Sequence, residues 1–229
     1  MKDDGWFVPH PLSAAAIERW VSATMASPAA TSTPDTPERI IQAARRLFGE
    51  RGVGGTTMSA IAAEAGVVRA TVYNNFSDKT EILSTLVRRY MKGYVAIRVQ
   101  LRAGFAASST NFEQLEAMTR MALAWRIANS DLREAIDIAR HTQGIGWEEA
   151  DAEADDAMLG WLVEMHQLGE RRGLTHPELD LSIATPAVYS MIESALSNFD
   201  VRSPASRAAL LAHQLTLIHW HAIYRYPPE

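Results

Sequence analysis

Apolar residues recur at helical spacing along most of the chain, and this pattern constrains the fold more than any other feature of the sequence. The segment that follows Pro37 shows the pattern clearly, with Ile40, Ala44 and Leu47 on one face of a helix. No stretch keeps the strict alternation of apolar and polar residues that a half-buried β-strand requires. Short breaks rich in Gly, Pro and Ser separate the periodic segments. The sequence therefore predicts an all-α protein.

The breaks also predict where the helices begin and end. The expected helices cover residues 37–51, 57–65, 69–75, 79–103, 111–129, 131–142, 147–172, 179–199 and 204–225. Pro37 suits the first turn of the first helix, and Gly52 ends that helix. Within the 179–199 segment, Pro186 either kinks the helix or marks its start, with Thr185 as the cap.

One predicted helix is long enough to belong to two domains. Asp78 and Glu81 have the spacing of a capping box at its start. A helix from Lys79 to Ala103 would be roughly 37 Å long at 1.5 Å per residue. Before the first helix, residues 26–37 are small, polar and Pro-rich, as in a flexible arm. Residues 12–25 have the spacing of a short amphipathic helix, and a natural start at Met25 is the alternative explanation of this extension.

Composition excludes several classes of site and places the chain in the cytoplasm. The chain has 229 residues, 47% of them hydrophobic, and no Cys, so we expect no disulfide, thiolate metal site or catalytic thiol. It has no run of about 18 apolar residues, and its N-terminus lacks the basic start of a secretory signal. We therefore expect no membrane partner.

The net charge of −5 is unevenly distributed along the chain. Residues 35–92 hold nine basic and six acidic side chains, a balance of +3, whereas residues 93–229 have a balance of −7. A local basic face is enough to meet phosphates, although this excess would also fit an ordinary solvated surface.

Residues 57–76 have the pattern of a helix-turn-helix. Ile61 and Ala62 face inward on the first helix, and Gly66 supplies the positive φ at which that helix ends. Val72 and Phe76 face inward on the second helix. Its outward face is short and polar, and consists of Arg69, Ala70, Thr71, Tyr73 and Asn74. Small, hydrogen-bonding and cationic side chains are what a helix in the major groove needs, so the segment predicts binding to double-stranded DNA.

From Pro37 to Leu83 the chain resembles the N-terminal domain of the TetR family of bacterial transcriptional regulators. The likeness lies in residues 37–52, in Thr56-Thr57, Ile61-Ala62, Ala65-Gly66-Val67 and Thr71-Val72-Tyr73-Asn74-Asn75-Phe76, and in Lys79 and Leu83. It implies a ligand-responsive repressor that binds a pseudo-palindromic operator as a homodimer and is released by a small-molecule effector. Three parts are then expected: an extension at 1–34, a helix-turn-helix DNA-binding domain at 35–83, and a ligand-binding and dimerisation domain at 84–229.

The resemblance also assigns roles to individual residues. It places at the DNA Thr57, Arg69, Ala70, Thr71, Tyr73, Asn74 and Lys79, with Tyr73, Thr57 and Lys79 as phosphate contacts. It implies dimerisation through residues 179–225, for which the expected seam is Tyr189, Ile192, Leu196, Leu211, Leu215 and Ile218. Two positions depart from the family pattern. Val68 stands where a capping residue such as Ser is usual, which weakens the helix by about 1 kcal/mol, and Asn75 stands where His is common.

The sensor segment is rich in aromatic and Met residues. Most such residues form core, and some would line a pocket that favours an apolar or aromatic effector. The candidates for ligand contact are Met118, Met121, Trp125, Arg126, His141, Trp147, Trp161, Met165, His166 and Tyr189.

Other kinds of site find little support in the sequence. His219 and His221, at i and i+2, point to nearly opposite sides of a helix and cannot bind one metal ion, so we expect surface or interface histidines. The acidic run after Asp151 lacks the Gly and the final Glu of a calcium loop. We expect no catalytic residue, metal or cofactor. The alternative function is an all-α enzyme or interaction protein that retains a helix-turn-helix head.

Overall fold

The computed structural model describes residues 34–105, 110–141 and 147–228, and the chain is all-α throughout these ranges. The only β-type pairing in them is a single bridge between Thr175 and Tyr224. None of the helices described has the length and hydropathy needed to cross a membrane. The predicted extension at 1–34 lies, apart from Pro34, outside the described residues.

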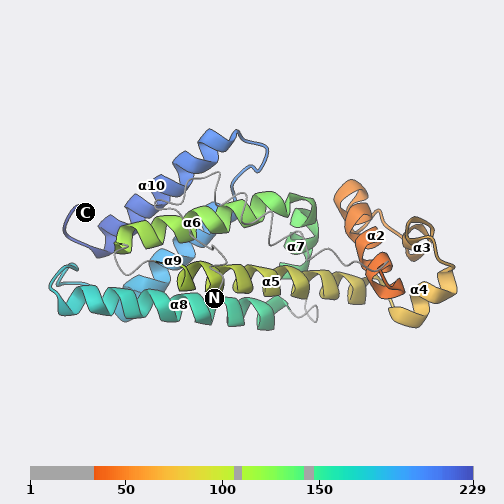
Figure 1. Cartoon of the computed structure of the whole chain (residues 1–229), viewed down its shortest axis with the longest axis horizontal. Helices are drawn as coiled ribbons and strands as arrows, with labels where there is room; N and C mark the ends of the chain where they lie inside the picture. Colours follow the sequence, from red (N-terminus) through yellow and green to blue (C-terminus); the bar gives the residue numbers. More distant parts are fainter. Residues whose placement is uncertain (1–33, 106–109, 142–146, 229) are drawn as a thin grey trace, which may run out of the picture. The chain divides into compact units, whose positions relative to one another are not determined.

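Every helix predicted from residue 37 onward is present, with ends within two residues of those expected (Figure 1), whereas the short helix predicted at residues 12–25 lies outside the described residues. The helices are α2 (Thr36–Arg51), α3 (Met58–Ala65), α4 (Arg69–Asn75), α5 (Lys79–Ala103), α6 (Asn111–Ala128), the 3₁₀ turn η1 (Ser130–Leu132), α7 (Arg133–Arg140), α8 (Trp147–Arg171), α9 (Leu181–Ser197) and α10 (Ala205–Ile223). Asp180 caps α9, which then runs through Pro186. The alternative in which Pro186 marks the start of this helix is therefore wrong.

The chain forms two compact units. The N-terminal unit consists of the described residues up to Val95 together with those from Ala128 to Asp155. The C-terminal unit consists of residues 96–127 and of the described residues from Asp156 onward. The chain passes from one unit to the other inside α5, at the end of α6 and inside α8. The domains predicted at 35–83 and 84–229 are functional divisions, and they stay a prediction.

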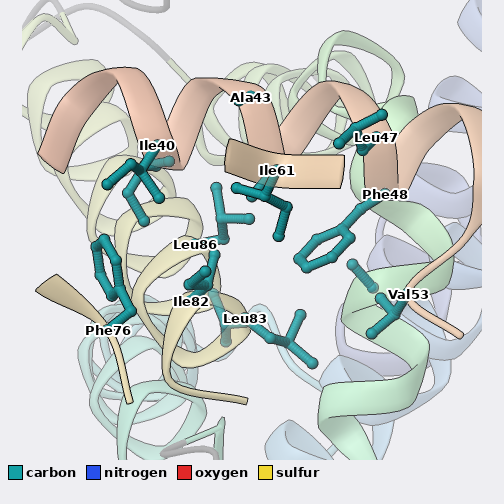
Figure 2. Packing of buried hydrophobic residues seen from close by; sticks show 14 of the residues in the cluster. Ile40, Ala43, Leu47, Phe48, Val53, Ile61, Phe76, Ile82, Leu83 and Leu86 are labelled. Carbon is teal, nitrogen blue, oxygen red and sulfur yellow. The ribbon is translucent and has the colours of Figure 1, made fainter. Parts of the chain in front are cut away.

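The core of the N-terminal unit forms around the apolar stripe of α2 (Figure 2). Ile40 and Phe48, both at most 2% exposed, point from α2 into this core. Ile61 of α3 and Leu83 of α5 approach them from the other helices. Full burial of such side chains contributes about 1.5–3 kcal/mol each. The helix-turn-helix is thereby fixed on α2 and the first half of α5.

A segment much further along the chain completes this core. Leu132 and Ile136, from η1 and α7, belong to the same buried cluster as α2. Arg45 of α2 donates two parallel hydrogen bonds to Asp131, 86 residues away, with distances of 2.6 and 2.9 Å. At Gly49 a Cβ atom would lie 3.1 Å from the Asp131 carbonyl oxygen, so Gly allows this close approach. The N-terminal unit thus includes more than the three helices of the motif.

In the C-terminal unit, α9 packs against α10, and aromatic rings cluster near the end of α10. Trp220 stacks on Tyr224 with 4.1 Å between ring centroids, and Phe112 of α6 meets Trp220 edge-on. The Trp220 indole N–H donates to the Tyr226 carbonyl at 2.7 Å. Such ring pairs add about 0.5–1.5 kcal/mol beyond the area that they bury. They fix the C-terminal residues onto α6.

Candidate nucleic-acid interface and ligand cavity

The turn between α3 and α4 depends on Gly66 and on an arginine from α2. Gly66 has φ 64° and ψ 38°, the left-handed conformation that ends α3 as predicted. The Arg39 guanidinium donates hydrogen bonds to the carbonyls of Ala65 and Gly66, at 2.6 and 3.1 Å. These carbonyls lie at the end of α3, where no further turn of helix can supply a partner. Arg39 therefore ties the turn to α2.

Helix α4 packs through the two residues predicted to face inward. Val72 is 0% exposed and Phe76 is 8% exposed, both in the core of the unit. Val68 precedes the helix and makes no side-chain cap, which confirms that the usual cap is missing. Asn75 donates from its amide to the Thr71 carbonyl at 2.8 Å, so this side chain bonds to its own helix.

The opposite face of α4 is open to solvent. Arg69, Ala70, Tyr73 and Asn74 are exposed, and Thr71 is half-buried. The Arg69 guanidinium donates to the Tyr73 hydroxyl at 3.1 Å and lies 5.2 Å from the centroid of its ring. Because these residues are four apart, the contact holds Arg69 along the helix axis. The structure therefore brings together on one face the residues that the sequence grouped there.

The two predicted flanking contacts already have structural roles. Thr57 caps α3, its hydroxyl oxygen accepting from the Ala60 N–H at 3.1 Å, and its hydroxyl proton stays available for donation. The Lys79 ammonium donates to the carbonyls of Val53 and Thr56, at 2.5 and 3.0 Å. An ammonium has three N–H groups, so one remains. Both residues can still bind a phosphate oxygen.

The partners of Arg69 and Lys79 differ from those of three other basic residues of the unit. Arg45, Arg46 and Arg89 each pair with a carboxylate, which offsets their charge locally. In the described part of the chain, Arg69 and Lys79 contact neutral groups instead, a phenol and two carbonyls. Their positive charge is therefore left for an anionic partner.

The spacing of residues in the sequence could not reveal two features of this site. The role of Arg39 requires the turn carbonyls, which are 26 and 27 residues away, to lie beside α2. The carbonyl partners of Lys79 are similarly distant, at 23 and 26 residues. No local spacing rule links such pairs, since only the packing of the helices brings them together.

The C-terminal unit contains a small, partly open cavity lined by residues of four helices. Its volume is about 30 Å³, which is large enough to hold a water molecule. The lining is mainly apolar, and its residues are Leu115, Met118, Thr119, Ala122, Met158, Leu162, Tyr189, Ile192, Glu193, Leu196 and His219. Glu193 forms a short ion pair with Arg126 of α6. The cavity therefore combines an apolar wall with a few polar groups.

A row of three buried polar side chains, linked by hydrogen bonds, leads away from the cavity lining at His219. His219 is 5% exposed, and its Nε2 lies 3.1 Å from Nε2 of His166, which is 0% exposed. His166 Nδ1 is 2.9 Å from the hydroxyl oxygen of buried Thr185. Burial lowers the pKa of His166 to about 4, and burial together with His166 lowers that of His219 to about 3. The expectation of a surface or interface position for His219 is therefore wrong.

The predicted ligand contacts separate into distinct groups. Met118 and Tyr189 line the cavity, and Arg126 and His166 contact residues of its wall. The rest of the buried set lies in the core of the same unit, at Met121, Trp125, Trp161 and Met165. His141 is exposed at the end of α7 in the N-terminal unit, where it lines a separate, open pocket of about 600 Å³ between α2 and α7. The Trp147 side chain lies outside the described residues. Among the described residues, no group of three or more potential ligands could hold a metal ion.

Comparisons with known proteins agree with this architecture. Residues 40–86 match the family model "Bacterial regulatory proteins, tetR family". An HTH-type transcriptional regulator of Staphylococcus aureus is 27% identical over 100 residues, which are 44% of this chain and 52% of that protein. The repressor BepR of Brucella suis is 42% identical over 55 residues, 24% of this chain and 26% of that protein. The chain thus spans about half the length of the first relative, and less of the second.

Among solved structures, the ketosteroid transcriptional regulator KstR2 of Mycobacterium tuberculosis has a similar fold. The TM-score is 0.62 at 18% sequence identity, over 85% of this chain and 98% of that one. At this identity the likeness concerns the fold. Residues 40–86 thus match the helix-turn-helix domain of the tetR family of bacterial regulatory proteins, and the chain shares its fold with KstR2.

Proposed function

We propose that the protein is a transcriptional regulator that binds double-stranded operator DNA through α4. The observation that carries this proposal is the open face of α4, where Arg69 is held along the helix by Tyr73. A recognition helix needs such a face, because base edges are contacted from its first turns. The names of the Staphylococcus and Brucella relatives support the same function.

Within this interface, we assign base contacts to Arg69 and Thr71 and backbone contacts to Thr57, Tyr73 and Lys79. Arg69 lies in the first turn of α4, and Arg is the commonest partner of guanine in the major groove. Thr57 and Lys79 flank the helix and keep a free proton donor each. Ala70 and Asn74 complete the exposed surface, Ala70 allowing close approach.

A homodimer through α9 and α10 is the second part of the proposal. Four large apolar side chains project from these helices into solvent, namely Ile183, Met191, Leu210 and Ile218, which are 45–68% exposed. Two copies of one short recognition helix would recognise half-sites spaced by about 34–36 Å or a multiple of it. Burial of these side chains against a second copy would remove apolar surface from water.

The seam predicted from the sequence needs correction, because Tyr189, Ile192, Leu196 and Leu215 are at most 6% exposed. They face the core of their own unit, so only Ile218 of the expected residues is exposed in the single chain. Leu211 is half-buried.

We further propose that the cavity of the C-terminal unit opens to take an uncharged, mainly apolar or aromatic effector with one hydrogen-bonding group. Ligand pockets usually measure about 300–1,000 Å³, so the walls must move. Met118 and Met158 are flexible side chains suited to this. Glu193 already has Arg126 as its counter-ion and would repel an added carboxylate. His219, neutral because burial lowers its pKa, can bond to a hydroxyl or carbonyl group.

The effector relieves repression if it and the operator DNA favour different conformations of the protein. An effector that weakens operator binding tenfold must itself bind tenfold more weakly to the DNA complex, a coupling of about 1.4 kcal/mol. The name of the Brucella relative, a repressor, supports this direction of regulation. We expect effector titrations with and without operator to differ accordingly.

Fluorescence anisotropy on the DNA upstream of the gene tests the central proposal. We expect binding to exceed that of a scrambled duplex, and the logarithm of the binding constant to fall linearly with the logarithm of salt. The R69A variant should lose the preference for the natural sequence. Failure to bind either duplex at low salt and micromolar protein would favour the enzyme or interaction protein that merely retains the head.

Thermal shifts with three probes of similar size test the effector class. Benzyl alcohol should raise Tm more than toluene, which lacks a hydrogen-bonding group, and benzoate should have the smallest effect. H219L should reduce the benzyl alcohol shift to that of toluene, whereas H221Q, at an exposed position of the same helix, should not. An equal shift with benzoate would contradict the proposal.

A further inference from the structure

Val68 combines two unfavourable features at the start of α4. It is 70% exposed, the highest fraction among the large hydrophobic side chains that the structure describes. It also occupies the N-cap position, where its side chain makes no hydrogen bond to the helix. A Ser or Asp at this position would remove both costs, since each is polar and able to cap.

No neighbouring side chain of the recognition face shields the two methyl groups of Val68. The side chain of Arg69, which follows directly, extends toward Tyr73 at the other end of the helix. Val67, which precedes it, is half-buried against the core of the unit. The result is an isolated apolar tip beside the cationic and phenolic groups proposed to contact DNA. Positions that break a local rule in this way are often functional.

We infer that Val68 is a specificity-determining residue that contacts the 5-methyl group of a thymine in each operator half-site. This inference rests on the proposed function of α4 as the recognition helix. The thymine methyl is the apolar group that a base pair presents in the major groove, and apolar side chains recognise it by contact. The residues at the N-terminus of a recognition helix are those closest to base edges. Val68 occupies that position, and a duplex would cover its exposed methyl groups.

The experiment begins with selection of bound sequences from random duplex DNA by the wild-type protein. We expect a thymine preference at one position of each half-site. Replacement of that thymine by uracil removes only the methyl group, and should weaken wild-type binding by about fourfold, the value for one buried CH₂-sized group. For V68S the thymine and uracil duplexes should bind equally well, and for V68A the difference between them should become smaller. V68S restores a capping side chain, so its helix is expected to form at least as well as that of the wild type.

A matched control is V99A, which removes the same atoms from a valine on α5 that is 58% exposed. It should keep the fourfold thymine effect. The inference is overturned if wild-type protein binds its selected DNA but shows no thymine effect, or if V68A retains the effect in full. Absence of any selected sequence for the wild type would instead overturn the proposed function, so the two failures are distinguishable.

Discussion

The Nε2 atoms of His166 and His219 lie 3.1 Å apart inside the C-terminal unit, so the N–H of one ring donates a hydrogen bond to the unprotonated nitrogen of the other. Tyr224, whose pKa burial raises to about 12, packs edge-on against His166 and stays neutral. His166 also bonds to the Thr185 hydroxyl through Nδ1, so each imidazole has a hydrogen-bonding partner while it is neutral. Protonation of both rings would place two like charges in contact, without water.

This pair predicts a loss of stability in mild acid. The pKa values in the folded state, about 4 and about 3, lie below the ordinary value of 6.5. The unfolded chain therefore binds more protons as pH falls below 6.5, and the free energy of unfolding decreases toward pH 4 by about 1.4 kcal/mol per pH unit for each His.

Urea unfolding at pH 7, 6 and 5 measures this slope. We expect H219Q to reduce it by about half, because Gln keeps a hydrogen bond and does not titrate. H221Q, at an exposed position, should leave it unchanged, and a wild-type curve that is flat between pH 7 and 5 would contradict the prediction.

Substitution of Gly66 by Ala should destabilise the N-terminal unit by about 1–2 kcal/mol, because an L-residue at φ +64° is strained. The added Cβ would also lie 3.0 Å from the Arg39 guanidinium that bonds to the turn. Gly54 provides the control, since a Cβ there would meet no atom within 4 Å and its φ is not positive. Thermal unfolding of G66A and G54A measures the difference. Equal Tm values for the two variants would show that the turn tolerates a side chain.

Substitution of Lys79 should affect stability more than substitution of Arg69, whereas Arg69 should matter more for sequence recognition. K79A removes the ammonium that two backbone carbonyls share, and we expect it to lower the free energy of unfolding by about 1 kcal/mol. R69A loses only an exposed contact to Tyr73, and should change it by less than about 0.5 kcal/mol.

In sequence recognition, R69A should have the larger effect of the two variants. R69A should cost about 1–3 kcal/mol on the operator and relax its sequence preference, whereas K79A should weaken all duplexes alike and reduce the salt slope by about 1. Anisotropy titrations of operator and random duplexes at several salt concentrations make the comparison. Equal losses on both duplexes for both variants would refute the assignment of base and phosphate contacts.

The exposed side chains of α9 and α10 predict the effect of charge on assembly. The double substitution M191E/L210E would place four carboxylates in a two-fold interface, two from each protomer. It should convert the dimer into monomers at micromolar concentration. Light scattering measures the molar mass. L168E changes a residue of α8 that is 36% exposed, and should leave the mass of the wild type unchanged. A monomeric wild-type protein would refute the proposed dimer itself.

The sequence by itself determined the helices, because their ends depend on interactions over a few residues. Asp35 and Thr57 accept hydrogen bonds from N–H groups three residues later, and Gly66 adopts the left-handed conformation for which it was identified. The Asp78 cap was likewise visible, although Glu81 bonds to Ser77 and completes the box one residue earlier than expected. Apolar spacing also identified the outward face of α4, since its few inward residues lie four apart.

Only the tertiary structure decided which apolar face of α9 meets the protein's own core. Tyr189 and Leu196 face inward and Met191 faces solvent, although all three are apolar residues of one helix. Periodicity marks apolar faces, and it does not say which of them covers the chain itself and which is left for a second copy. The same limit applies to His219, whose burial depends on a partner 53 residues away. Such contacts are set by how helices pack, and no spacing within one helix encodes them.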